Sequence, residues 1–181
     1  DPARPLRVQG AQTRLPRMRH RGPLHFSSQD AGGLVSLLFG GSRDELRRGW
    51  LQAWQQARAG ALLTPLETQL AAIVGEHPEY HLWLEQGDAA LQADFGPESG
   101  RTNPFLHLSM HMALREQVGT DRPAGIRRIH SRLSRQHGAH DAEHRMMEAL
   151  GRALWEAQRA GTAPDERRYL EDLERLISTR R

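Results

Sequence analysis

The chain has 181 residues, enough for one domain with a sizeable core, and its longest apolar run, LVSLLF at residues 34–39, is far too short to cross a membrane. It contains no cysteine, which excludes disulfides and thiolate metal sites. The formal net charge is +3, but six arginines and two aspartates place +4 on residues 1–30, so the rest of the chain is nearly neutral and nucleic-acid binding by the folded part is not favoured.

Residues 1–35 are expected to form a disordered basic extension. They contain four prolines and show no sustained apolar periodicity. Such an arm can touch an anionic partner, nucleic acid included, or can be a solvated tail. Because no secretory signal pattern is recognisable either, a soluble, cytoplasmic protein is the expectation. Residues 36–181 are predicted to form the folded domain.

Helix-starting caps and apolar residues at helical spacing predict the elements of this domain. A capping box at Ser42 and Glu45, a Thr64-Pro65 start and an Asn103-Pro104 start are the clearest of these signals. About six helices are predicted, over residues 42–60, 64–77, 103–119, 126–136, 140–160 and 165–177.

Proline and glycine positions predict the breaks between these helices. Pro78 is expected to interrupt the second helix, with a short restart over residues 80–84. Residues 86–102 are predicted to be an irregular connection containing one short turn near residues 89–91. No strand pattern occurs, so the fold class is predicted to be all-α, a single bundle-like domain.

Histidine spacing is the main functional signal. His107 and His111 lie four residues apart on one predicted helix, and His140 and His144 have the same spacing on another. Two imidazoles one helical turn apart project the same way and can chelate a metal ion. If the two helices face each other, these four histidines could bind a divalent metal such as zinc, iron or manganese. A third pair, His77 and His81, straddles Pro78, so a shared face is less expected there.

Two glutamates follow these histidines closely. Glu116 comes five residues after His111, and Glu148 comes four residues after His144. Either carboxylate could complete a ligand set or orient an imidazole from outside it. The two spacings resemble short fragments of hemerythrin-like di-iron bundles, although a glutamate replaces the aspartate in one of them. No nucleophile elbow or phosphate loop is present, so catalytic residues are unknown.

A second interpretation stays open beside metal binding. The histidines can form a hydrogen-bonded polar seam in the core of a non-catalytic structural or interaction module. That module is predicted to form a homodimer through an exposed apolar patch, built from Trp50, Trp54 and leucine-rich helix faces.

Six segments carry a resemblance to a known family: LFGGSRDELRR, EHPEYH, TNPFLHLSMHMALREQ, DRPAGIR, HDAEHRMMEALGRALWEAQRAG and PDERRYLEDLERL. They keep their order and spacing, and together they resemble a small uncharacterised bacterial family, the domain of unknown function 1841 family. The resemblance runs from about Leu38 to the C-terminus. It implies no established activity, and it implies that residues 1–35 lie outside the family domain.

Overall fold

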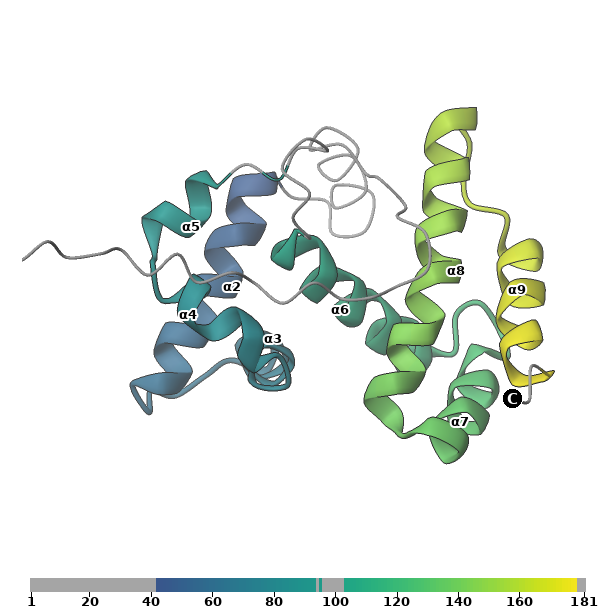
Figure 1. The fold of residues 1–181 in the computed structure, drawn as a ribbon, viewed down its shortest axis with the longest axis horizontal. Helices are drawn as coiled ribbons and strands as arrows, with labels where there is room; N and C mark the ends of the chain where they lie inside the picture. The colour runs from purple at the N-terminus through teal and green to yellow at the C-terminus, as the bar shows by residue number, and fades with distance from the viewer. Residues whose placement is uncertain (1–41, 94, 96–102, 179–181) are drawn as a thin grey trace, which may run out of the picture.

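The structure is a computed structural model that describes residues 42–93, 95 and 103–178. The predicted N-terminal extension lies outside these residues. Within them every regular element is helical, so the prediction of an all-α fold is confirmed (Figure 1). No helix among the described residues is long and apolar enough to cross a membrane.

The described residues form eight α-helices and one short 3-10 helix. In chain order they are α2 (Arg43–Arg58), α3 (Pro65–Gly75), η1 (Pro78–Tyr80), α4 (His81–Leu84), α5 (Asp88–Gln92), α6 (Pro104–Thr120), α7 (Ile126–His137), α8 (Ala139–Ala160) and α9 (Glu166–Ser178). The number exceeds the predicted six because the chain between α3 and α6 forms three short helical pieces.

Side-chain caps fix where three of the long helices begin. Ser42 and Glu45 bond each other's backbone N–H groups at the start of α2, and Thr64 and Glu67 do the same at α3. The side chain of Asn103 accepts a hydrogen bond from the backbone N–H of Leu106 at the start of α6. Each cap satisfies backbone donors that the first helical turn leaves unpaired, so all three predicted starts are confirmed.

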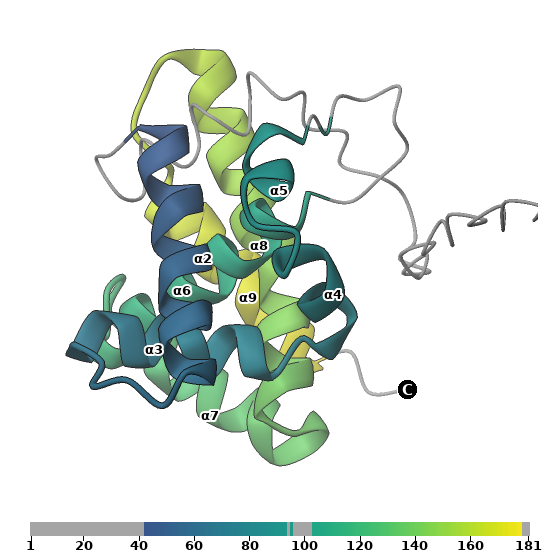
Figure 2. The same ribbon diagram turned by 90° about the vertical axis from the view of Figure 1, so that its left-hand side faces the viewer.

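Two hydrophobic clusters form the core, and α6 contributes to both of them. One cluster joins α2, α3 and the short helices to Phe105 and Leu108 at the start of α6. The other joins α7, α8 and α9 to Ala113 and Leu114 further along α6. Figure 1 shows α6 lying between α2–α5 on one side and α7–α9 on the other, and Figure 2 views the molecule from the side of α2–α5. The middle of α6 is therefore the place where the two halves of the core meet.

The predicted tryptophan patch is not on the surface. Trp50 is only 2% exposed and belongs to the first hydrophobic cluster, and Trp54 is half-buried against it. The indole Nε1–H of Trp50 donates to the hydroxyl of Ser109 at 3.3 Å, which ties α2 to α6. The prediction was wrong for the tryptophans, because Trp50 packs in the core beside α6 and the ring of Trp54 lies 4.3 Å from that of His81.

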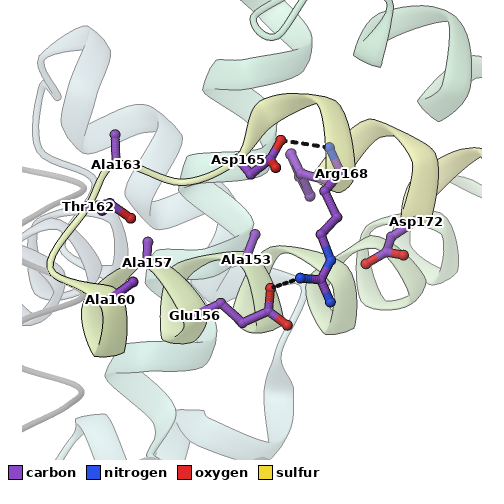
Figure 3. Close-up of a pocket in the computed structure, with 10 residues that line it drawn as sticks. Ala153, Glu156, Ala157, Ala160, Thr162, Ala163, Asp165, Arg168 and Asp172 are labelled. Carbon is purple, nitrogen blue, oxygen red and sulfur yellow. Dashed lines mark hydrogen bonds and ion pairs between the residues drawn. The ribbon is translucent and has the colours of Figure 1, made fainter.

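A pocket between α8 and α9 lies apart from the histidines (Figure 3). It has a volume of about 140 Å³ and small side chains, among them Ala153 and Ala157, line it. Its charged groups are engaged with one another: the guanidinium of Arg168 lies 3.0 Å from the carboxylate of Glu156, and Asp165 accepts a hydrogen bond from the Arg168 backbone. The Arg168–Glu156 pair attaches the start of α9 to α8, and Asp165 caps the first turn of α9, so both contacts have a structural role.

Candidate metal centre

Four histidines meet where the two hydrophobic clusters join. His77, two residues after α3 ends, lies beside His107 and His111 of α6 and His144 of α8. One ring nitrogen from each lies within 4.8 Å of those of the other three. His77 and His111 are fully buried, and His107 and His144 are partly buried.

The four Nε2 atoms form a closed ring of short contacts. His77 lies 2.9 Å from His111 and 3.2 Å from His107. His144 closes the ring at 3.3 Å from His111 and 3.1 Å from His107. All four imidazoles therefore direct the same nitrogen at one common point.

The backbone at Pro78 positions His77. Proline disfavours helical angles at the preceding residue, and His77 has φ −124° and ψ 65°. The chain turns out of α3 there, while Nδ1 of His77 stays bonded to the carbonyl of Ile73 at 2.7 Å. This bond fixes the ring and leaves Nε2 directed toward α6.

A carboxylate positions His111 in the same manner. Nδ1 of His111 lies 2.6 Å from Oε2 of Glu143, which is only 5% exposed. Arg115 holds Glu143 in turn, through its Nε at 3.0 Å from the other carboxylate oxygen, and also reaches Glu76 at 2.6 Å. A histidine whose outer nitrogen donates to a carboxylate is the usual arrangement around protein-bound metals, because it fixes the tautomer and makes the inner nitrogen more basic.

These outer partners fix the protonation of two inner nitrogens. A carbonyl and a carboxylate only accept hydrogen bonds, so Nδ1 of His77 and Nδ1 of His111 both carry the proton. In neutral rings, both Nε2 atoms then hold bare lone pairs, 2.9 Å apart. Two such lone pairs repel each other unless a positive charge lies between them.

A proton is poorly suited to supply that charge. Burial lowers the pKa of His77 and the pKa of His111, in the second case against the favourable influence of Glu143. Burial, together with the other histidines, lowers the pKa of His107 to about 2. Near neutral pH these three imidazoles are therefore uncharged nitrogen donors, the form in which imidazole binds metals.

The size of the ring matches one metal ion. Zinc binds imidazole nitrogen at about 2.0–2.1 Å, and four ligands at the corners of a tetrahedron of that size are about 3.3–3.4 Å apart. The four measured contacts run from 2.9 to 3.3 Å. These four contacts are close to the ligand spacing around one zinc ion, and all six pairs lie within 4.8 Å, so the cluster could hold a metal ion.

The carboxylate of Glu143, beside the histidines, carries a negative charge. Burial would raise the pKa of Glu143, but hydrogen bonds from His111 and Arg115 outweigh it and hold the pKa of this carboxyl below its usual value. Glu143 is therefore ionised beside the histidines at neutral pH. This negative charge next to neutral ligands favours a cation at their centre, and the guanidinium of Arg115 offsets part of it.

The structure brings together three of the four histidines predicted from the sequence. His107, His111 and His144 meet as expected, whereas His140 is not among the four whose ligand atoms cluster, and His77 occupies the fourth place. His81, which shares the spacing of His77, points elsewhere and bonds the carbonyl of Val74 at 2.8 Å.

The sequence did contain a signal for His77. It comes four residues after Ile73, so it extends the buried face of α3 by one turn. The two predicted carboxylates are both exposed, Glu116 on α6 and Glu148 on α8. Glu143 contacts His111 in their place, so the prediction of Glu116 or Glu148 beside the imidazoles was wrong.

The fold and the cluster define a class: an all-α protein with a buried group of four histidines that could hold a metal ion. Within that class the chain belongs to the family described as Domain of unknown function (DUF1841), which matches residues 42–175. All four histidines fall within the match. Comparisons with curated proteins and with solved structures gave no match.

Proposed function

We propose that this protein binds one divalent transition-metal ion through the Nε2 atoms of His77, His107, His111 and His144. The observation that carries the proposal is the 2.9 Å approach of two unprotonated nitrogens, on His77 and His111, in the interior. A cation accepts both lone pairs and removes the repulsion between them. The cation also accepts the Nε2 lone pairs of His107 and His144, which are directed at the same point.

The ligand chemistry favours some metals over others. Imidazole nitrogen suits zinc, iron, copper and nickel, whereas manganese prefers carboxylate and other oxygen ligands. Of the three metals expected from the sequence, zinc and iron therefore fit the all-histidine set better than manganese. The carboxylate of Glu143 offsets part of the ion's charge through His111.

Four protein ligands around one ion support a structural role for the metal. Structural zinc sites are closed by four protein ligands, whereas catalytic sites keep a position open for water or substrate. The four histidines come from the end of α3, from α6 and from α8, which belong to different halves of the core. A bound ion would fasten the two halves together.

The alternative is a metal-free polar seam in an interaction module. In a neutral seam, His107 and His144 could donate Nε2–H to His77 and His111, which satisfies two of the four contacts. The 2.9 Å contact would still oppose two lone pairs, and the 3.1 Å contact between His107 and His144 would oppose two N–H groups. A metal ion accounts for all four contacts.

Homodimer formation is the partner prediction attached to that alternative. Its surface would have to come from the large apolar side chains that remain exposed among the described residues, Leu62, Leu66 and Leu82. Leu66 also lines a groove of about 930 Å³ between α2, α3 and α6. Sedimentation of the protein with and without metal would measure dimerisation and show whether it depends on the metal.

Elemental analysis of protein purified without an affinity tag or chelator tests the proposal. We expect close to one equivalent of zinc or iron per chain, or uptake of one equivalent by the metal-free protein. The His111→Ala variant should lose it, and the matched variant His137→Ala, at the end of α7, should keep it. Metal-free protein that takes up none of zinc, iron, copper or nickel would refute the proposal.

A further inference from the structure

A fifth histidine lies against the cluster without belonging to it. The ring centre of His140 is 4.3 Å from that of His144 and 5.0 Å from that of His77. Its plane is nearly parallel to that of His111, at 11° and 5.3 Å. The side chain of His140 is 39% exposed, whereas that of His111 is fully buried, so His140 reaches from the solvent to the cluster.

The inner nitrogen of His140 is unsatisfied. Nδ1 is buried and has no hydrogen-bond partner among the described residues, although Oε2 of Glu76 lies 3.4 Å away. Buried polar atoms normally have partners, so an exception beside a cluster of potential ligands needs an explanation. A separation of 3.4 Å is too long for a good hydrogen bond, but it is about the distance between two ligands of one tetrahedral zinc ion.

Glu76 is exposed enough to meet an ion from solution. Its side chain is 41% exposed and follows α3, directly before His77. Its carboxylate accepts a hydrogen bond from the guanidinium of Arg115 at 2.6 Å, which holds the side chain at this rim. A carboxylate oxygen and an imidazole nitrogen together make a two-ligand site for a divalent metal.

Arg115 keeps this pair from being a tight site. Its guanidinium lies 2.6 Å from the same Glu76 oxygen that faces His140. A metal bound there would have to share the carboxylate with this cation and would have only two protein ligands. Such a site is suited to brief occupancy, whereas the four buried nitrogens nearby are suited to retention.

We infer that His140 and Glu76 form a transient metal site at the rim, through which a divalent ion passes into and out of the four-histidine centre. The inference rests on the proposed function, because it concerns how that centre is loaded. It assigns His140 and Glu76 a kinetic role. Both rates of exchange depend on the rim site, while the equilibrium affinity depends on the four buried histidines.

Zinc exchange kinetics of the full chain test this. Metal-free protein is mixed with zinc in the presence of a dye that reports free zinc, and loaded protein is mixed with excess EDTA. The variants are His140→Ala, Glu76→Gln and the two combined, with His137→Ala as the control. Circular dichroism of each variant checks that it is folded.

The expected result is that uptake and release both slow by about tenfold in each single variant, while the dissociation constant is unchanged. The double variant should be no slower than either single one, because both residues serve one site. Unchanged rates in either single variant would overturn the inference. Loss of bound zinc at equilibrium in His140→Ala would also overturn it, since His140 would then be a permanent ligand. If wild-type protein takes up no zinc, the proposed function itself fails.

Discussion

Nε2 of His77 lies 2.9 Å from Nε2 of His111, although each histidine already uses its other ring nitrogen to donate a hydrogen bond. The two residues are 34 positions apart in the chain and come from different helical segments. Two nitrogen lone pairs this close together in the protein interior repel each other and would lower the stability of the fold. A bound metal ion would remove this repulsion, and the predictions below follow from that.

Removing the metal should destabilise the fold. The ion would bind only the folded chain, which assembles the four ligands, and such binding adds about 2.7 kcal/mol of stability at a free concentration 100 times the dissociation constant. We expect a lower melting temperature after treatment with a chelator and full recovery when zinc is restored. Equal melting temperatures for the loaded and metal-free protein would contradict this.

Replacing His77 and replacing His81 should have different effects on metal binding. The two residues are four positions apart, but only His77 points at the cluster, and His81 bonds the carbonyl of Val74. His77→Ala should therefore abolish stoichiometric metal, whereas His81→Ala should keep it and lose about 1 kcal/mol of stability with its hydrogen bond. Elemental analysis and urea unfolding of both variants measure this, and retention of metal by His77→Ala would be the contrary result.

Glu143 should tune the affinity without being a ligand. Glu143→Gln keeps the shape of the side chain but removes the charge that orients His111 and pairs with Arg115. Loss of such an outer partner typically weakens metal binding about 10–100-fold. Competition with a zinc chelator measures the change. Glu148→Gln, on the exposed face of the same helix, serves as the matched control and should bind zinc as the wild type does.

The metal-free protein should lose stability in acid through its histidines. Burial lowers the pKa of His77, His107 and His111 below the value of about 6.5 that they regain on unfolding. Below that pH the unfolded chain therefore binds more protons than the folded chain, and stability falls as the pH falls.

The expected slope is about 1.4 kcal/mol per pH unit, at most, for each histidine that stays neutral in the folded state. It should begin near pH 6.5 and, for His107, continue toward its folded pKa of about 2. Urea unfolding of metal-free protein at several pH values measures it, and a His107→Gln variant should show a shallower slope. A flat profile between pH 7 and pH 5 would contradict the burial of neutral imidazoles.

Local signals in the sequence predicted the helices well because the chemistry that starts them is local. The hydroxyl of Thr64 and the carboxylate of Glu67 bond backbone groups within one turn, so four residues of sequence are enough to place that helix start. The short helices between α3 and α6 were predicted less completely. Helices of this length have few internal hydrogen bonds, and packing against the rest of the protein stabilises them.

The candidate site was predicted only in part, because part of its geometry depends on contacts between helices that are far apart in the sequence. The i, i+4 spacing shows that His107 and His111 share a face of α6, and the same holds for His140 and His144 on α8. Which residue of the second pair reaches the first depends on how α8 crosses α6, and spacing within one helix carries no such information. His77 enters the site because the backbone turns at Pro78, and the orientation of that turn depends on tertiary contacts.

The most direct test of the four-histidine centre is X-ray absorption spectroscopy at the metal edge of loaded, tag-free protein. The proposed site predicts about four nitrogen neighbours at about 2.0–2.1 Å for zinc in the wild-type protein, with the outer-shell scattering that imidazole rings produce. His77→Ala protein given one equivalent of zinc should lack this four-nitrogen shell. A first shell dominated by oxygen, or one that is identical in wild-type and His77→Ala protein, would contradict it.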